Sequence, residues 1–229
     1  MPKAIVVEDP QLAHVVAVAK ASSPENGLRD AALLLCCFGT GMKPAELAQL
    51  LVSDYLSPGG NPLVETVVRP EIAFNGRARP LFWVNKKLIT TIDEHLADRL
   101  KRGHGITGRL TAYRGLDPQS GLFVSGRTGQ PLKLTRIERD GRVSYRADQI
   151  TALIAHLFAQ AGIEGATAQS ARRTLAVKLK RQGIDERHIG EILGMTSIKA
   201  IKTLCDTDPV RLGKVRISHM AREHLLVTH

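Results

Sequence analysis

Cationic side chains next to glycine turns are the residues of this sequence best suited to chemistry. Lys43 follows the turn residue Gly41 by two positions, and Glu46 lies three residues later, one helical turn away. Arg172 lies near the start of a predicted helix that carries further lysines and arginines. An arginine binds phosphate through two parallel hydrogen bonds, whereas a lysine acts as a point charge. The expected chemistry is therefore contact with phosphate groups.

Two stretches around these cations resemble the catalytic segments of the tyrosine recombinases, the phage integrase family. Residues 40–47 are similar to the family's box in which a glycine turn precedes an arginine and a glutamate. Residues 167–209 are similar to the segment in which a His-x-x-Arg pair, a Leu-Gly-His turn and a tyrosine nucleophile follow one another. Asp208-Pro209 falls where the family has a proline after the tyrosine, which supports the register of the comparison.

This resemblance implies a fold that is mainly α with a small antiparallel β-sheet (α+β), the catalytic-domain fold of the tyrosine recombinases. We expect an N-terminal arm at 1–26, the catalytic-like domain at 27–211 and a C-terminal tail at 212–229. Most of these recombinases also carry a helical N-terminal domain that closes around DNA, and we expect no counterpart of it here.

Hydrophobic patterning predicts the elements that position the cations. We expect helices at 28–38, 88–102 and 148–162. We expect strands at 64–68, 72–74 and 79–84, with a hairpin turn at Asn75-Gly76. A charged hairpin at 136–146 is interpreted as an insertion or a lengthened loop. His156 lies off the apolar stripe of its helix and is expected at the surface.

Most positions that carry chemistry in the family hold other residues here. By the resemblance, Gln169 replaces the first histidine, Met195 the second histidine or tryptophan, and Leu204 the tyrosine. Arg172 retains its arginine, and Lys43 stands at the other arginine position. A leucine has no nucleophilic atom, and a glutamine donates hydrogen bonds but cannot transfer a proton. We therefore expect no strand cleavage by the family's route, and a protein that is not an enzyme.

Two further questions concern the family's catalytic lysine and a replacement nucleophile. Phe74 falls at the lysine position, or Asn75 does if the hairpin register differs by one residue. Cys205 is adjacent to the tyrosine position, but neighbouring helical residues point about 100° apart, and a nearby acidic residue disfavours the thiolate. Three tyrosines lie outside the motif, at Tyr55, Tyr113 and Tyr145. We expect core or surface roles for all of them.

A DNA-contacting surface is the function that these residues would retain, because backbone contacts from cations supply affinity without reading sequence. The residues expected to contact DNA are Lys43, Arg77, Arg79, Arg172, Arg173, Lys178, Lys199 and Lys202. The alternative for the hairpin arginines and for Lys178 is an ordinary solvated surface.

The charge distribution agrees with a polyanionic partner. The 229 residues carry a net charge of +10, yet residues 1–68 hold 4 Lys/Arg against 7 Asp/Glu, so the excess of positive charge lies in the rest of the chain. Three cysteines show no disulfide or metal-ligand spacing, and no apolar run is long enough to span a membrane. We expect a cytoplasmic, nucleoid-associated protein with no metal, cofactor or membrane contact.

These observations lead to one preferred function and two alternatives. We expect a protein that binds double-stranded DNA and serves as an accessory or regulatory factor in recombination, mobile-element biology or transcription. Its expected partners are DNA and either an active recombinase or a second copy of the chain, bound through the C-terminal tail. The alternatives are an active recombinase with a displaced nucleophile and a protein-interaction module that partners an intact recombinase.

Overall fold

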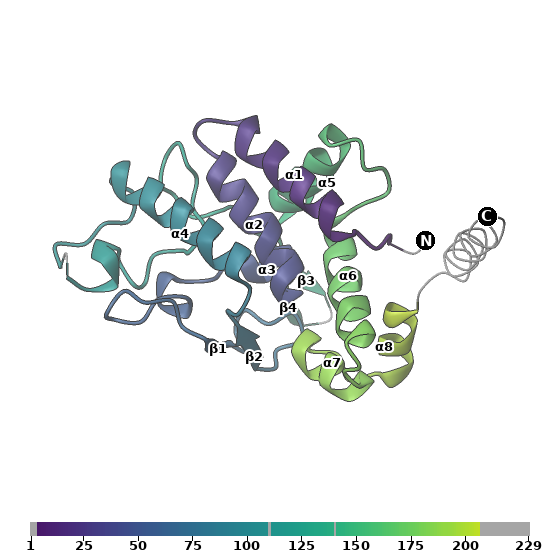
Figure 1. The fold of residues 1–229 in the computed structure, drawn as a ribbon. Helices are drawn as coiled ribbons and strands as arrows, with labels where there is room; N and C mark the ends of the chain where they lie inside the picture. Colours follow the sequence, from purple (N-terminus) through teal and green to yellow (C-terminus); the bar gives the residue numbers. More distant parts are fainter. Residues whose placement is uncertain (1–3, 110, 140, 207–229) are drawn as a thin grey trace, which may run out of the picture.

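The structure, a computed structural model, describes residues 4–109, 111–139 and 141–206 (Figure 1). Its elements follow in the order α1 (Asp9–Ser22), α2 (Gly27–Thr40), α3 (Pro44–Leu47), η1 (Val52–Asp54), β1 (Glu65–Val68), β2 (Arg79–Phe82), α4 (Lys86–Lys101), η2 (Tyr113–Gly115), β3 (Thr135–Arg139), β4 (Arg142–Arg146), α5 (Asp148–Gln160), α6 (Ala168–Arg181), α7 (Glu186–Leu193) and α8 (Ile198–Cys205). Helices dominate, and two small antiparallel hairpins complete the α+β fold that the sequence predicts.

Helix α2 is the centre of the molecule. It is buried along most of its length and packs against α1, α4 and α6, as its almost uninterrupted apolar sequence requires (Figure 1). The helix ends at Gly41, whose φ of 66° is a left-handed conformation that glycine adopts without steric cost. This confirms the helix predicted at 28–38 and fixes the direction in which the chain enters α3.

Helix α1 packs as part of the main domain, which differs from the arm expected at 1–26. Val7, Leu12, Val15 and Ala19 are buried in the same apolar core as α2. In addition, the Val7 N–H donates a hydrogen bond to Thr174 Oγ1 over 2.9 Å. The predicted tail at 212–229 and the Asp208-Pro209 landmark lie outside the described residues.

The two hairpins confirm part of the strand prediction. Strands β1 and β2 pair with Thr66 opposite Leu81, whereas the third strand expected at 72–74 is wrong. The chain turns there because the Ala73 N–H bonds to the Arg69 carbonyl, and the Phe74 N–H bonds to a Glu46 carboxylate oxygen at 3.0 Å instead of a neighbouring strand. Strands β3 and β4 form the charged hairpin that was predicted at 136–146.

Apolar side chains gather in two cores of unequal size. The large core includes residues of α1, α2, α4 and α5, and the exposed His156 lies outside it as expected. A small second core lies between α6, α7 and α8, and its buried members are Ala176, Ile189, Leu193, Ile201 and Cys205. The last two helices of the described chain therefore form a small unit that contacts the rest mainly through α6 and β2.

Candidate nucleic-acid interface

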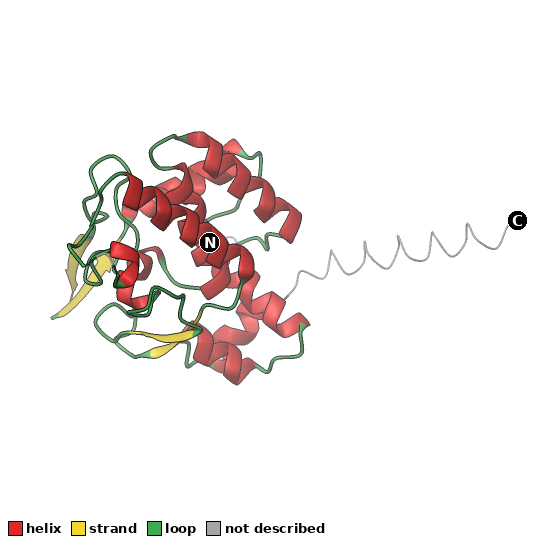
Figure 2. Cartoon of the chain, turned by 60° about the vertical axis from the view of Figure 1, so that its left-hand side comes forward, coloured by secondary structure: helices red, strands yellow, loops and turns green. Residues whose placement is uncertain are grey.

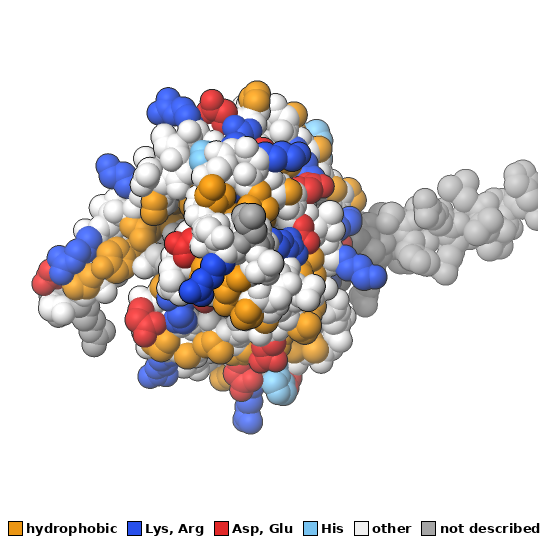
Figure 3. All heavy atoms as spheres, turned by 90° about the vertical axis from the view of Figure 1, so that its left-hand side faces the viewer, with side chains coloured by type: hydrophobic (Ala, Val, Ile, Leu, Met, Phe, Trp, Pro, Cys, Tyr) orange, Lys and Arg blue, Asp and Glu red, His pale blue; other side chains and the backbone are white. Residues whose placement is uncertain are grey.

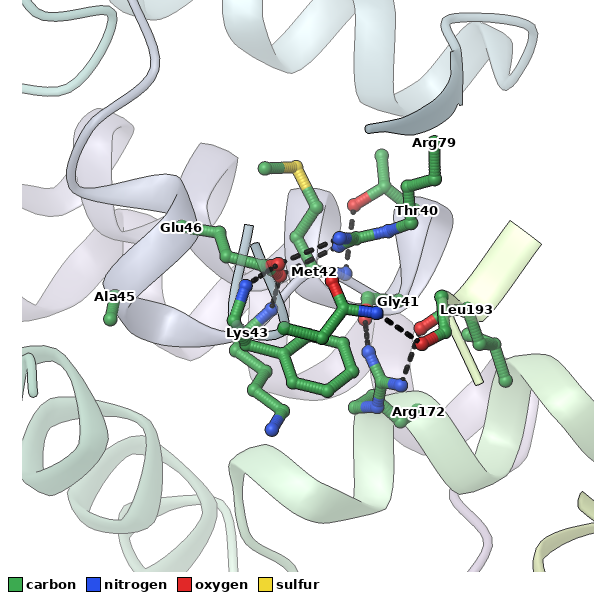
Figure 4. Close-up of polar contacts among 12 residues, drawn as sticks. Thr40, Gly41, Met42, Lys43, Ala45, Glu46, Arg79, Arg172 and Leu193 are labelled. Atoms are coloured by element: carbon green, nitrogen blue, oxygen red, sulfur yellow. Dashed lines mark hydrogen bonds and ion pairs between the residues drawn. The ribbon is translucent and has the colours of Figure 1, made fainter. Parts of the chain in front are cut away.

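Four separate parts of the chain meet beside the end of α2. They are the Gly41 turn with the start of α3, the connection between β1 and β2, the first turns of α6, and the end of α7 (Figure 4). Thr167 caps α6 by accepting a hydrogen bond from the Gln169 N–H, and Gly194 ends α7 with a φ of 66°. Helix ends and turns thus bring residues that are far apart in sequence into one site.

A buried ion pair between Glu46 and Arg79 forms the floor of this site. The two guanidinium nitrogens, Nη1 and Nη2, each donate to a different carboxylate oxygen over 2.7 Å, and both side chains are at most 3% exposed. Arg79 was expected to contact DNA, with a solvated hairpin position as the alternative, but the structure buries it against Glu46. Arg79 is the first residue of β2, where the alternation of the strand points it inward with Leu81.

Arg172 uses its guanidinium to join two chain turns. Nη1 donates to the Gly41 carbonyl and Nη2 to the Leu193 carbonyl, both over 2.7 Å (Figure 4). Next to it, Asn75 Nδ2 donates to the Gly194 carbonyl over 2.9 Å. Arg172 therefore lies where the sequence predicts a phosphate contact, but both of its terminal nitrogens already bond to backbone carbonyls.

The ring of Phe74 lies among the cations of the site. Lys43 Nζ is 3.6 Å from the ring centroid, and the guanidinium carbons of Arg172 and Arg79 are 5.1 and 5.7 Å from it. All three distances are within the range of a cation–π attraction. We call Lys43, Glu46, Phe74, Arg79 and Arg172 the Phe74 cluster; it contains three cations and one carboxylate.

The pKa values in the cluster reflect this excess of positive charge. Burial and the nearby Arg172 lower the pKa of Lys43, and burial, opposed by the Glu46 carboxylate, lowers that of Arg172 to about 10. Burial alone would raise the pKa of Glu46, but the hydrogen bonds and charge of Arg79 outweigh it and hold that pKa below 4.5. The cluster therefore favours an anion more than it favours further positive charge.

The other positions matched to catalytic residues lie on α6, just after α7 and on α8, and they supply no reactive group. Gln169 is exposed at the start of α6, and Met195 is half-buried, with its N–H bonded to the Gly190 carbonyl over 2.7 Å. Leu204 is half-buried and packs against the small core of α6 to α8. Phe74, or Asn75 if the register differs by one residue, falls at the position matched to the lysine, and none of these side chains can shuttle a proton.

The residues considered as replacement nucleophiles lie in unfavourable surroundings. Cys205 is buried, and burial raises its thiol pKa, which leaves little of the reactive thiolate. Tyr55 is buried in the main core and donates its hydroxyl hydrogen to Asp93 Oδ1 over 2.9 Å, and burial together with that carboxylate raises its pKa. Tyr145 lies exposed on β4, and Tyr113 lies in η2.

Two more of the predicted DNA contacts on α6 face the protein. Arg173 is buried, and its Nη2 donates to the Asp206 carbonyl over 2.7 Å. Lys178 forms an ion pair with Asp9 of α1, and its side chain is 30% exposed. The side chain of Arg173, which was expected to contact DNA, is thus turned toward the end of α8 and away from solvent. The ion pair between Lys178 and Asp9 was not foreseen from the sequence, because the two residues are far apart along the chain.

Three of the predicted contacts remain available to a partner. Arg77, Lys199 and Lys202 are exposed, and they form no ion pair in the described part of the chain. Arg77 lies on the connection that carries Phe74, and the two lysines lie on α8, which Ser197 caps by accepting the Ala200 N–H. Exposed cations thus lie on the connection that carries Phe74 and on α8, which follows the end of α7.

Sequence patterning also missed two buried polar residues of α4. Arg99 is 1% exposed and donates from Nη1 to the carbonyls of Gly121 and Leu122 over 2.7 and 3.1 Å. His95 is 2% exposed and stacks on Phe123. Hydrophobic patterning could not find them, because they lie on the buried face of α4 at helical spacing from its apolar residues but are themselves polar. They fix the loop after α4 and lie away from the candidate site.

Comparisons with known proteins identify the fold. No family model and no curated protein matches the sequence. Among solved structures, the XerA recombinase superposes with a TM-score of 0.63 at 21% identity, over 96% of this chain and 64% of that one. The XerH site-specific recombinase, bound to its palindromic difH substrate, superposes with a TM-score of 0.60 at 16% identity, over 94% of this chain and 53% of that one. The Tn1549 transposon integrase, in complex with transposon right end DNA, superposes with a TM-score of 0.59 at 14% identity, over 96% of this chain and 67% of that one.

The protein therefore has the fold of the tyrosine recombinase catalytic domain, as the sequence motifs predicted. It spans between about half and two thirds of the length of the recombinases and integrases that it matches. None of the helices in the described part of the chain combines the length and apolar character that crossing a membrane requires.

Proposed function

We propose that the protein binds double-stranded DNA without cleaving it, and that it acts as an accessory or regulatory factor in recombination, mobile-element biology or transcription. In this role it works beside an intact recombinase, which supplies the nucleophile, or as an oligomer of its own. The fold supports the first part of the proposal, because structures with this fold include a recombinase and an integrase in complex with DNA.

The charge of the chain supports DNA as the partner. The excess of positive charge lies in the part of the chain that follows β1, and that part includes Phe74, Arg79 and Arg172 of the cluster as well as α8. Exposed cations release counterions when they contact a phosphate backbone, which drives association at low salt. Arg77, Lys199 and Lys202 have the exposure that such contacts require.

The composition of the Phe74 cluster and its surroundings carries the second part of the proposal. Strand cleavage by a tyrosine recombinase needs a nucleophilic hydroxyl and a proton donor, and Leu204 and Phe74 stand at the matched positions. The donors of Arg172 and Arg79 are bonded to protein acceptors. An excess of positive charge without a nucleophile favours holding a phosphate backbone over breaking it.

Fluorescence anisotropy with a random-sequence 30-base-pair duplex across a salt series tests DNA binding. We expect a linear fall of log affinity with log salt, and a triple variant with Arg77, Lys199 and Lys202 changed to Ala should flatten the slope by roughly 0.9 per lost phosphate contact. Lys101→Ala, an exposed lysine at the end of α4, is the control. Absence of binding at low salt would contradict the proposal.

Nicked suicide substrates test the absence of cleavage. After incubation with such duplexes, the protein should migrate as free polypeptide on a denaturing gel, because no described residue at the matched position can form a phosphotyrosyl bond. A band that resists SDS and carries labelled DNA would show a displaced nucleophile and refute this part of the proposal.

A further inference from the structure

The β3–β4 hairpin stands away from the rest of the molecule. Its strands pair only with each other in the described chain, and the space-filling view shows an arm with apolar and basic side chains separated from the body (Figures 2 and 3). A two-stranded hairpin on its own is marginally stable in water. The base of this one is therefore expected to need support from the domain.

Packing at its base holds the hairpin in place. Leu134, just before β3, packs against the main core, and Ala147, just after β4, is buried. Arg146 donates from Nε and Nη2 to Asp148 Oδ1 over 2.9 and 2.7 Å, which joins β4 to the start of α5. The hairpin also contacts α3, the helix that begins beside Lys43. The arm is thus fixed on the side of the molecule that carries the Phe74 cluster.

One face of the arm presents an aromatic ring, an aliphatic side chain and a cation to solvent. Arg136 lies directly opposite Tyr145, and Glu138 lies opposite Val143, so that the four side chains share one face. Tyr145 and Val143 are 42% and 46% exposed. The two apolar side chains lie next to each other on this face and are open to contact by a partner.

The charge of the hairpin selects the partner. Residues 133–146 contain five Lys/Arg and two Asp/Glu, a net of +3. The described ion pairs on the arm, Arg136 with Glu138 and Arg146 with Asp148, are more than half exposed on both sides. Exposed pairs of this kind contribute little to stability, so that an arginine can exchange its carboxylate for a phosphate at little cost.

We infer that the β3–β4 hairpin is a DNA-contacting arm, a second contact surface beside the Phe74 cluster. This inference rests on the proposed function. A two-stranded ribbon fits the major groove of B-form DNA. Arg136 contacts a backbone phosphate, and the side chains of Tyr145 and Val143 lie against sugars and base edges. Anchoring at both ends of the hairpin holds these side chains in position before DNA arrives.

A double variant, Arg136→Ala with Tyr145→Ala, tests the arm in the full chain. Loss of one phosphate contact should flatten the slope of log affinity against log salt by about 0.9. If the two proteins bind equally at 1 M salt, this change weakens binding to the 30-base-pair duplex roughly eightfold at 0.1 M salt. The matched control is Lys101→Ala with Ile106→Ala, which removes an exposed cation and an exposed apolar side chain elsewhere. Circular dichroism checks that both variants are folded. If the double variant is unfolded, Arg136→Gln alone replaces it and should give the same change in the slope of log affinity against log salt.

The outcomes separate this inference from the proposed function. If the wild-type chain binds duplex and the double variant binds with the same affinity and slope, the inference is overturned and the proposed function stands. If the double variant changes only self-association in analytical ultracentrifugation, the arm is a protein interface and the inference is again overturned. If the wild-type chain binds no DNA, both fail. A benzophenone side chain at position 145 should crosslink to the duplex, and one at position 106 should not.

Discussion

Phe74→Ala is the change that tests the Phe74 cluster most directly. The ring is 40% exposed, so that truncation removes about three fifths of the burial of a phenylalanine, worth roughly 1–2 kcal/mol. It also removes the attraction to Lys43, whose Nζ lies 3.6 Å from the ring centroid, worth about 0.5–1 kcal/mol. Together these losses predict a fall of about 1.5–3 kcal/mol in stability and of roughly 3–12 °C in Tm.

DNA binding should change in the opposite direction. Without the ring, the Lys43 ammonium is open to solvent, and the described structure shows it in no ion pair. One added phosphate contact steepens the slope of log affinity against log salt by about 0.9. If the two proteins bind equally at 1 M salt, this change raises affinity roughly eightfold at 0.1 M salt. Arg172 adds less, because its two terminal nitrogens remain bonded to the carbonyls of Gly41 and Leu193.

Thermal unfolding and anisotropy across a salt series measure the two effects on the same preparations. Phe74→Leu is the matched control, since it keeps an apolar cover and loses the aromatic face. It should lose stability without a steeper salt dependence. If Phe74→Ala is less stable and also binds DNA no more tightly, with an unchanged slope, the ring does not shield Lys43 from phosphate and the reasoning is refuted.

Three further changes test other parts of the structure. Glu46→Gln leaves the buried Arg79 without its counter-charge and should cost about 3–5 kcal/mol in urea unfolding; a loss below 1 kcal/mol would mean that the pair is open to water. Burial lowers the pKa of His95 to about 3 from an ordinary 6.5, so that the unfolded chain binds the proton first as pH falls below 6.5. Stability should therefore drop by about 2 kcal/mol between pH 7 and pH 5, and His95→Phe should remove that pH dependence. Leu204→Tyr restores a hydroxyl but no proton donor at Phe74, and it should form no SDS-resistant adduct on nicked duplexes; an adduct would show that the site needs only the nucleophile.

Sequence patterning predicted the elements whose signals are local. The apolar run of α2 and the glycine after it define a buried helix and its end without reference to the rest of the chain. The hairpin of β3 and β4 follows from alternation around a turn. The motifs matched Lys43 and Arg172 to the two arginine positions of the family, and in the structure both cations lie against the Phe74 ring. In each case the residues involved are adjacent or belong to a known motif.

Contacts between distant segments could not be predicted in this way. Arg79 and Lys178 both looked like surface cations, because nothing near them in sequence indicates a partner. Their carboxylates come from Glu46 and Asp9, which are far away along the chain. The direction of Arg79 also depends on where β2 begins, since a shift of one residue moves a side chain to the other face of the hairpin. Prediction failed where a charge depends on tertiary packing.

The aromatic ring at position 74 and the bonding of the arginines are physically connected. Three cations around one carboxylate repel one another, and a lysine at position 74 would add a fourth charge to a half-buried site. An aromatic ring instead attracts each cation and excludes water from between them. With the ring in place, Arg172 and Arg79 donate hydrogen bonds to protein acceptors. A phosphate that binds these two arginines would have to replace those bonds. If the proposed function is correct, DNA is therefore held by cations at the edge of the cluster and on the hairpin arm, and the arginines at its centre stabilise the fold.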